Sequence, residues 1–487
     1  MHDSDEARTN ARVRATLSIA AGLALALFLR GFLNRSAYPY DILPDEGLMS
    51  LYASRLAAGE PIYALDRGFP YLYNNYAPLT YVLLAPLIAL FGPSLAFARC
   101  LSLISSLGLA ALGSYWLRRF APNTRGVEAV VAAGLVTSPM LYLWQVPGRT
   151  DPLSVLLSAA AFHVAWRLYE GDSRRHLPLL LAALAILAVF TKQNNLVALI
   201  AVWASLFPRM GKKAAIGLAG SLAFCMVLVG VLDLATHGAF WHSMTFAVLH
   251  LRRVWSKLAY LWWYLGSQAG WLLLAAAAAL LPEVRRRISL PHVAGLAVGI
   301  WQLFEITRAG AGPNYFLPFH FFLVLTGGIA AVALMSREAF VRPVTLLLCA
   351  QMAVNFGGLW SKTEPIPAAA LESAQRLVRL VAAAPGPVLL DRQPQIFLEA
   401  GKKDHYVEVT SLGLDEFHGR WHPEELRDCL ERQCFSLVVL RPRTLLPAEL
   451  QRLVARNYKP LGPVNLVDEP VWVLEPRGEG APSPQQD

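Results

Sequence analysis

The chain has 487 residues, of which 55% are hydrophobic and 16% are charged, and its net charge is +9. Soluble domains carry about 25% charged residues, whereas apolar runs of about 17–25 residues, enough to cross a bilayer as helices, recur along this chain. The composition excludes a soluble globular protein. The basic residues are scattered in short loops and form no stripe, which argues against nucleic-acid binding. We therefore expect a polytopic α-helical membrane protein.

A short N-terminal segment, residues 1–13, precedes the first apolar run, which ends near Leu33. Arginine beside a span favours the cytoplasmic side, so Arg8, Arg12 and Arg14 predict a cytoplasmic N-terminus. Such a start resembles a signal sequence, but no cleavage site is evident and an acidic stretch follows at once. We therefore expect an uncleaved membrane anchor.

The predicted first external loop, residues 34–94, begins with an acidic stretch in which Asp41, Asp45 and Glu46 place three carboxylates within six residues. Pro44 and the helical spacing of the apolar residues that follow predict a short surface helix with Asp45 and Glu46 in its first turn. Acidic residues there can simply complement the positive end of the helix. The alternative is that these carboxylates take part in catalysis.

About eleven membrane spans are predicted within residues 14–361. The apolar piece Leu79–Phe91 is not among them, because about thirteen residues are too few to cross, and we expect it at the interface or as a re-entrant segment. With the N-terminus inside, the basic clusters between spans fall on the cytoplasmic side. The exception is the loop that contains Arg252, Arg253 and Lys257, which is predicted outside.

Residues 362–476 differ in character from the rest of the chain and predict a small extracytoplasmic α/β domain, followed by a disordered tail at 477–487. Cys429 and Cys434 could form a disulfide there if the region lies outside the cytoplasm. Short strands are predicted at Val388–Asp391, Phe435–Leu440 and Val471–Leu474, and helices at Leu371–Ala384, Pro423–Glu431 and Pro447–Asn457.

Three polar interruptions of apolar sequence are predicted on the outer face: Arg149-Thr-Asp151, Lys192-Gln-Asn-Asn195 and the segment from Arg308 to Tyr315. Each has a structural explanation, respectively a local ion pair, a hairpin turn for which Asn-Asn is suited, and a plain connection. Charges at membrane depth cost about 2.5–3.5 kcal/mol on insertion scales and are usually functional. The alternative is that these cations, with Arg252 and Arg253, meet an anionic partner.

Carboxylates beside cations suit a substrate that has an anionic head and a neutral nucleophile. A carboxylate near a hydroxyl can act as general base, worth roughly 10²–10⁴-fold in rate, and cations stabilise charge on a departing phosphate. A sugar carried on a lipid phosphate meets both demands, and no Gly-rich phosphate loop is present. The sequence does not decide whether a metal ion takes part. His242 and His250 could be ligands, but lone histidines in a loop are more often merely polar residues.

Several short motifs between residues 15 and 335 resemble those of the GT-C superfamily of polyprenol-phosphate-dependent glycosyltransferases. The resemblance is to the protein O-mannosyltransferase and lipid A aminoarabinose transferase group and to related bacterial core-sugar transferases. The order of the motifs along the chain and their predicted placement carry the resemblance. They are Asp45-Glu46-Gly47, Tyr76-Ala-Pro-Leu-Thr-Tyr81, Phe91-Gly92, Ala96-Phe-Ala-Arg99, Arg149-Thr-Asp151, Thr191-Lys-Gln193 and Asn314-Tyr-Phe316.

The resemblance implies a GT-C-like helical bundle and an enzyme of the bacterial inner membrane that acts on the extracytoplasmic face. It would transfer a sugar, with inversion, from a polyprenyl-phosphate carrier to a lipid, glycan or protein acceptor; some members use a divalent metal. Asp45 maps onto the catalytic acidic residue, with Glu46 beside it, and Arg149 and Lys192 onto the cations that bind the donor phosphate. Arg252 and Arg253 are added from their location. The remaining substrate-binding candidates are Tyr76, Asp151, Gln193, Asn314 and Tyr315.

Two other classes of function fit parts of the sequence. A transporter or lipid flippase also uses polar breaks in its helices. Such proteins have paired broken helices at mid-membrane in two related halves, and no repeat is visible in this sequence. A non-catalytic scaffold that displays the C-terminal domain would leave the pair Asp45-Glu46 without a purpose.

Overall fold

A computed structural model describes the chain at residues 2–43, 46–64, 74–121, 123–249, 253–286, 288–308, 310–391, 393–402, 406–407, 423–442, 444, 446–467 and 469–478. The chain forms two compact units, and each draws on several separate segments. The first contains Met1–Arg35, Arg99–Leu228 and Arg252–Glu364. The second contains Ser36–Ala98, Val229–Leu251 and Pro365–Asp487.

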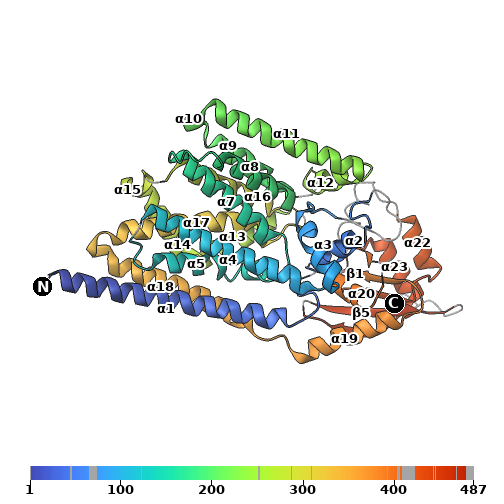
Figure 1. Cartoon of the computed structure of the whole chain (residues 1–487). Coiled ribbons are helices and arrows are strands. Elements are labelled where there is room, and N and C mark those ends of the chain that lie inside the picture. Colours follow the sequence, from blue (N-terminus) through green and yellow to red (C-terminus); the bar gives the residue numbers. More distant parts are fainter. Residues whose placement is uncertain are drawn as a thin grey trace. The chain divides into compact units, whose positions relative to one another are not determined.

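The first unit is a helical bundle (Figure 1). Its central helix, α17, is almost entirely buried and packs against α5, α7, α14, α16 and α18. The helices are α1 (His2–Ser36), α4 (Leu95–Phe120), α5 (Val127–Val136), α6 (Tyr142–Gln145), α7 (Asp151–Tyr169), α8 (Leu177–Thr191), α9 (Leu196–Ala204), α10 (Phe207–Met210), α11 (Lys212–Ala235), α13 (Ala259–Ser267), α14 (Ala269–Leu280), α15 (Pro282–Arg285), α16 (Leu290–Glu305), α17 (Leu317–Met335) and α18 (Glu338–Trp360), with 3₁₀ turns η1 (Gln193–Asn195), η2 (Trp255–Leu258), η3 (Pro313–Phe316) and η4 (Ser361–Thr363).

Within the described residues, five helices are long and apolar enough to cross a membrane, namely α1, α4, α11, η3 with α17, and α18 with η4. A sixth span results if the helices on either side of Gln268, which meet at 80°, are one broken span. Apolar side chains on α11 face outward, and Leu234 is 80% exposed. The chain therefore has the helices of a membrane protein, whereas the count of about eleven spans stays a prediction.

Several predicted spans are interrupted in the structure, and polar side chains satisfy the backbone at the breaks. At the bend between α13 and α14, Gln351 accepts a hydrogen bond from the Gly270 amide (2.9 Å) and donates one to the Ser267 carbonyl (2.8 Å). A helix can be broken at membrane depth only where other groups pair with the freed backbone. These bonds explain why a single long apolar run becomes two short helices.

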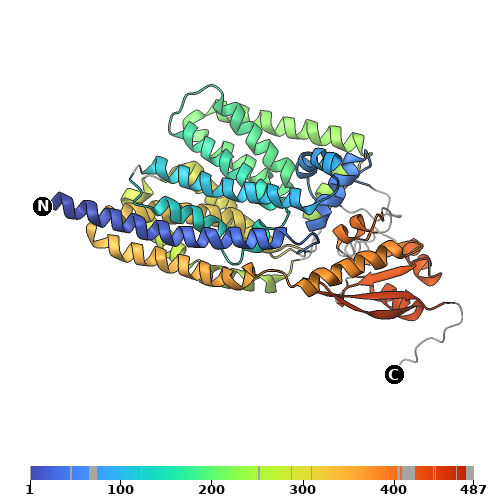
Figure 2. The ribbon, with the colours of Figure 1, turned by 60° about the horizontal axis from the view of Figure 1, so that its bottom comes forward.

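The second unit contains the helices α2 (Glu46–Ala57), α3 (Leu79–Phe91) and α12 (Ala239–Leu249) and the C-terminal α/β region. Its sheet has the order β2-β1-β3-β5-β4, in which β2, β1 and β3 are parallel and β5 and β4 are antiparallel. Figure 2 shows α19 lying along one face of this sheet. The elements are α19 (Ala368–Ala383), β1 (Val388–Asp391), α20 (Pro394–Glu399), β2 (Tyr406–Val407), α22 (Glu424–Glu431), β3 (Leu437–Leu440), α23 (Ala448–Asn457), β4 (Tyr458–Asn465) and β5 (Pro470–Pro476).

Side chains alternate between the faces of this sheet, as the two-residue period of a strand requires. Leu389 and Val438 pack with α22 and α23 in one apolar core. The strand β4 was not among the predicted strands, and it contains Pro460 and Pro463. The structure tolerates both at the end of the sheet, where β4 pairs with one neighbour only and its register shifts after Pro460. Cys429 and Cys434 are free thiols.

Candidate active site

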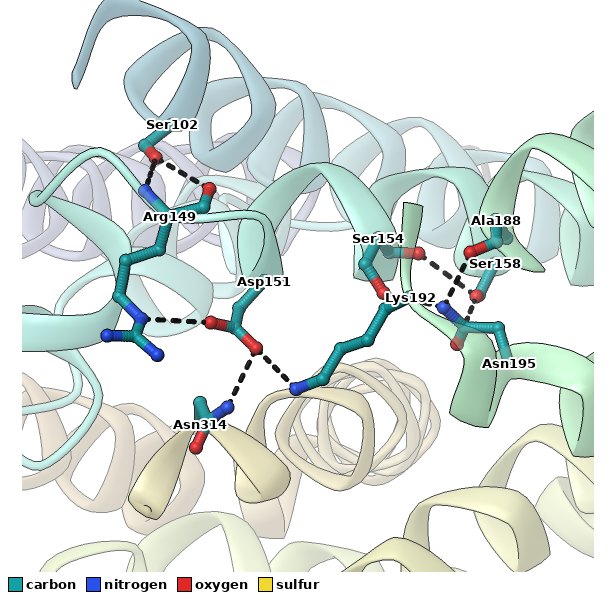
Figure 3. A network of polar contacts seen from close by, with 9 residues as sticks. All are labelled: Ser102, Arg149, Asp151, Ser154, Ser158, Ala188, Lys192, Asn195 and Asn314. Carbon is teal, nitrogen blue, oxygen red and sulfur yellow. Dashed lines mark hydrogen bonds and ion pairs between the residues drawn. The ribbon is translucent and has the colours of Figure 1, made fainter. Parts of the chain in front are cut away.

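The first candidate site lies in the helical unit and is built around the carboxylate of Asp151, the first residue of α7. Its Oδ1 accepts hydrogen bonds from Lys192 Nζ (2.6 Å) and Asn314 Nδ2 (2.8 Å), and Arg149 Nε contacts Oδ2 at 3.1 Å (Figure 3). Asp151 is 2% exposed, Arg149 6% and Lys192 8%. We call Arg149, Asp151, Lys192 and Asn314 the Asp151 cluster. It brings together residues from all three predicted polar interruptions.

The Asp151 cluster carries two cations and one anion. Burial alone would raise the pKa of Asp151, but Lys192, Arg149 and the amide of Asn314 stabilise the ionised form and hold that pKa well below its ordinary value. Two buried cations therefore lie close together around a single carboxylate, an arrangement that suits a site for an anion.

This electrostatic arrangement makes a prediction about pH. A depressed folded-state pKa means that ionised Asp151 stabilises the fold above its unfolded pKa of about 3.9 and that this stabilisation is lost only as pH falls further. The difference in melting temperature between wild type and Asp151→Asn should therefore stay constant from pH 8 to pH 5. Thermal unfolding in detergent measures it, and a difference that shrinks between pH 7 and pH 5 would contradict the assignment.

Neighbouring groups fix the two cations in place. The Arg149 guanidinium lies 4.5 Å from the centre of the Trp144 ring, and the Lys192 ammonium lies 4.4 Å from that of Tyr315. Ser102 bonds both backbone groups of Arg149, accepting from its amide at 3.0 Å and donating to its carbonyl at 3.1 Å. Positively charged groups over aromatic faces gain about 0.5–2 kcal/mol. Tyr315, a predicted substrate-binding residue, thus lies beside the cluster, and Gln193 directly follows Lys192 in η1.

The break between α8 and α9 places Lys192 and depends on Asn195. Lys192 has extended backbone angles, which ends α8. The Asn195 amide donates to the Ser154 hydroxyl (2.6 Å) and the Ala188 carbonyl (3.0 Å), and its oxygen accepts from Ser158 (3.0 Å). Asn195 therefore ties the break to both α7 and α8 (Figure 3).

Replacing Asn195 with alanine should destabilise the helical unit by about 1–3 kcal/mol, because the Ala188 carbonyl and the hydroxyls of Ser154 and Ser158 each lose one buried hydrogen bond. The matched control is Asn194→Ala, since Asn194 stands next to Asn195 without these three bonds. Melting temperatures in detergent compare the two variants. Equal losses would show that the three bonds do not hold the break.

Arg253, another predicted substrate-binding residue, lies in a separate group. Its guanidinium pairs with Glu305 (3.4 Å) and donates to the Phe304 carbonyl (2.9 Å) and the Thr307 hydroxyl (2.7 Å), and it is not part of the Asp151 cluster. Lys257 donates to the carbonyls at 308 and 311 (2.8 and 2.7 Å). These contacts hold the segment that leads to Asn314. Arg252 lies outside the described residues.

The second candidate site lies in the other unit, in the acidic loop before α2. Asp45 lies outside the described residues. Glu46 is fully buried, and its carboxylate accepts a hydrogen bond from the Ile42 amide (3.0 Å). Asp41 is also fully buried and accepts hydrogen bonds from the amides of Gly47 and Gln395, the latter at 3.1 Å. The two described carboxylates are therefore both bonded to backbone amides.

A groove with a volume of about 350 Å³ lies in the same unit between α2, the end of α3 and the end of α20. Leu51, Ile88 and Leu398 form apolar parts of its lining, and Arg55 and Lys402 supply charge. Tyr76 is not in that lining; its carbonyl accepts a hydrogen bond from the Tyr63 hydroxyl (2.7 Å). Tyr76 thus holds the loop before α3 to residues that follow α2.

Metal ligands form no cluster in the part of the chain that the structure describes: no group of three or more His, Cys, Asp or Glu side chains could hold an ion. His242 lies on α12, and His250 is outside the described residues.

Comparison with known proteins finds similarity in structure and none in sequence. No family model and no curated protein matches the chain. The aminoarabinose transferase ArnT from Cupriavidus metallidurans, solved with undecaprenyl phosphate bound, is similar with a TM-score of 0.63 at 14% identity, over 96% of this chain and 99% of that one. The oligosaccharyltransferase AglB from Archaeoglobus fulgidus, solved with an inhibitory peptide and a dolichol-phosphate, gives a TM-score of 0.56 at 10% identity, over 96% and 74%.

Both of these proteins are GT-C glycosyltransferases. The likeness to ArnT extends over nearly the full length of both chains, so it includes both units of the present structure. This chain therefore has the GT-C fold that ArnT and AglB share, as the sequence resemblance predicts.

Proposed function

We propose that this protein is a membrane glycosyltransferase that moves a sugar from a polyprenyl-phosphate carrier to an acceptor on the extracytoplasmic side of a bacterial inner membrane. The observation that carries the proposal is the Asp151 cluster, a buried group in which two cations share one carboxylate inside a GT-C fold. The undecaprenyl phosphate bound to ArnT supports a lipid phosphate as the anion that such a group would hold.

In this proposal Lys192 and Arg149 bind the donor phosphate. An ammonium has three N–H donors and a guanidinium has five; Asp151 accepts one of them from Lys192 and contacts Arg149 Nε. Asp151 orients the two donors, and Asn314 orients Asp151. As the bond between the anomeric carbon and the phosphate oxygen breaks, the charge that develops on the phosphate is stabilised by groups already in place.

Asp45 is the proposed general base. Its carboxylate takes the proton of the acceptor hydroxyl while the hydroxyl oxygen bonds to the anomeric carbon and the polyprenyl phosphate leaves with the electron pair of the broken bond. Attack opposite to the leaving phosphate inverts the anomeric configuration. Glu46, whose carboxylate bonds the Ile42 amide, supports the loop in which Asp45 lies.

The test is transfer by the purified protein from a synthetic polyprenyl-phosphate sugar, with envelope lipids and glycans as acceptors. The proposal expects a glycosylated product of inverted configuration and free polyprenyl phosphate in equal amounts. The same preparation in liposomes reports flux of the lipid-linked sugar. Flux without a transfer product would replace the proposal with a flippase.

A further inference from the structure

The carboxyl ends of the parallel strands in the C-terminal sheet form the edge at which open α/β sheets bind ligands. The strand β1 lies between β2 and β3, so the chain leaves β1 in one direction and returns on the opposite side. Such a reversal of strand order marks the ligand crevice in folds of this kind. In this chain that position is where β1 and β3 end.

The two strand ends are joined by an ion pair. Asp391, the last residue of β1, is fully buried and pairs with Arg441, which directly follows β3, at 3.2 Å; Arg441 also pairs with Glu469 at 3.0 Å. After Asp391 the chain turns through Gln393, whose φ of 66° is left-handed, into α20. The start of α20 is therefore held at this edge.

The acidic loop of the same unit bonds to the start of α20. The Asp41 carboxylate accepts the amide hydrogen of Gln395 (3.1 Å) with one oxygen and that of Gly47 with the other. Asp41 is 0% and Gln395 1% exposed. A methyl group on Gly47 would lie 2.5 Å from Asp41 Oδ1 and 2.9 Å from the Gln395 nitrogen, so only glycine fits there. We call Asp41, Gly47 and Gln395 the loop clamp.

A second contact runs between the same two segments. The Tyr40 hydroxyl interacts with Glu399, the last residue of α20, and the side-chain amide of Gln395 donates to Glu399 at 3.3 Å. The helix α2, which follows the loop, packs against α20 as well (Figure 1). The loop is thus bonded to both ends of α20, although about 350 residues separate them in the sequence.

We propose that the α/β domain serves to hold the acidic loop, with the ligand edge of its sheet occupied by this chain's own Asp41 in place of a small molecule. Asp41 is a positioning residue: it fixes Gly47, two residues after Asp45 in the sequence, against α20. The effect on catalysis rests on the proposed function, in which Asp45 is the general base. The contact between Asp41, Gly47 and Gln395 is independent of that function.

The test uses the full-length protein in detergent and the variants Asp41→Asn, Asp41→Ala and Gly47→Ala. The control is Glu475→Gln, because Glu475 forms a surface pair with Lys459 in the same domain. Hydrogen exchange measured by mass spectrometry should show protection of the peptide that contains Gly47 falling by about tenfold or more in Asp41→Ala, with β1 and β3 peptides unchanged. Asp41→Asn should lose less, since its one amide oxygen still accepts a bond.

Transfer kinetics supply the second readout. In Asp41→Ala we expect kcat to fall by roughly tenfold to a hundredfold, as for a misplaced catalytic group, with the KM for the donor within about twofold of wild type. Unchanged exchange at Gly47, or equal loss of protection throughout the domain, would overturn the clamp. The wild type could show no transfer activity while Asp41→Ala still loses protection in the peptide that contains Gly47. That result would overturn the proposed function and leave the loop clamp supported.

Discussion

Replacing Asp45 with asparagine is expected to lower kcat for sugar transfer by roughly 10²–10⁴-fold, the usual contribution of a general base. Asparagine has nearly the same size and can still bond a hydroxyl, but it cannot take its proton. The KM values for donor and acceptor should change little, because the lost interaction belongs to the transition state. Initial rates with the synthetic polyprenyl-phosphate sugar measure the effect.

The neighbouring carboxylate is the matched control for Asp45. In Glu46→Gln the remaining side-chain oxygen can still accept the hydrogen bond from the Ile42 amide, so we expect the variant to retain at least about a tenth of the wild-type kcat, a change of no more than about 1.4 kcal/mol in the barrier. Equal activity of wild type and Asp45→Asn would remove Asp45 from the mechanism. A larger loss in Glu46→Gln would assign the base to Glu46.

The second large effect is expected at Asp151. Removing one member of a buried ion pair leaves uncompensated charge and typically costs about 3–5 kcal/mol, and in Asp151→Ala both Arg149 and Lys192 lose their carboxylate. We expect a fall of this size in the free energy of unfolding and no detectable transfer. Denaturant or thermal unfolding in detergent, followed through tryptophan fluorescence, measures the first quantity.

A comparison with Lys192→Met separates stability from binding. That variant leaves the pair of Arg149 and Asp151 intact and balanced in charge, so it should unfold at close to the wild-type temperature while the KM for the donor rises. If Lys192→Met were as unstable as Asp151→Ala, Lys192 would serve the fold and not the donor.

The sequence predicted where the polar side chains of the site interrupt apolar helices, but not how they pair. Lys192 and Asn195 were placed at an interruption, because the polar segment 192–195 splits a long apolar run. Their partners Asp151 and Ser154 lie about forty residues away, in another helix. No local pattern indicates that contact, since it depends on how the helices pack.

In the C-terminal domain, the predicted strands at Val388–Asp391 and Phe435–Leu440 overlap β1 and β3, because each is a short apolar run between polar segments. The helix α20 has only six residues and was not predicted. The bond between Asp41 and α20 joins segments from the two ends of the sequence. In the sequence, Asp41 is one of three acidic residues in the loop. Only the tertiary structure shows that Asp41 accepts a hydrogen bond from the start of α20.

The most direct test of the account is binding of labelled undecaprenyl phosphate to the purified protein in lipid nanodiscs. We predict saturable binding to wild type, about tenfold weaker binding to Lys192→Met, equivalent to about 1.4 kcal/mol, and unchanged binding to the surface control Lys459→Met. No saturable binding to the wild type, or the same affinity for the wild type and Lys192→Met, would contradict the assignment of the Asp151 cluster as the site for a lipid phosphate.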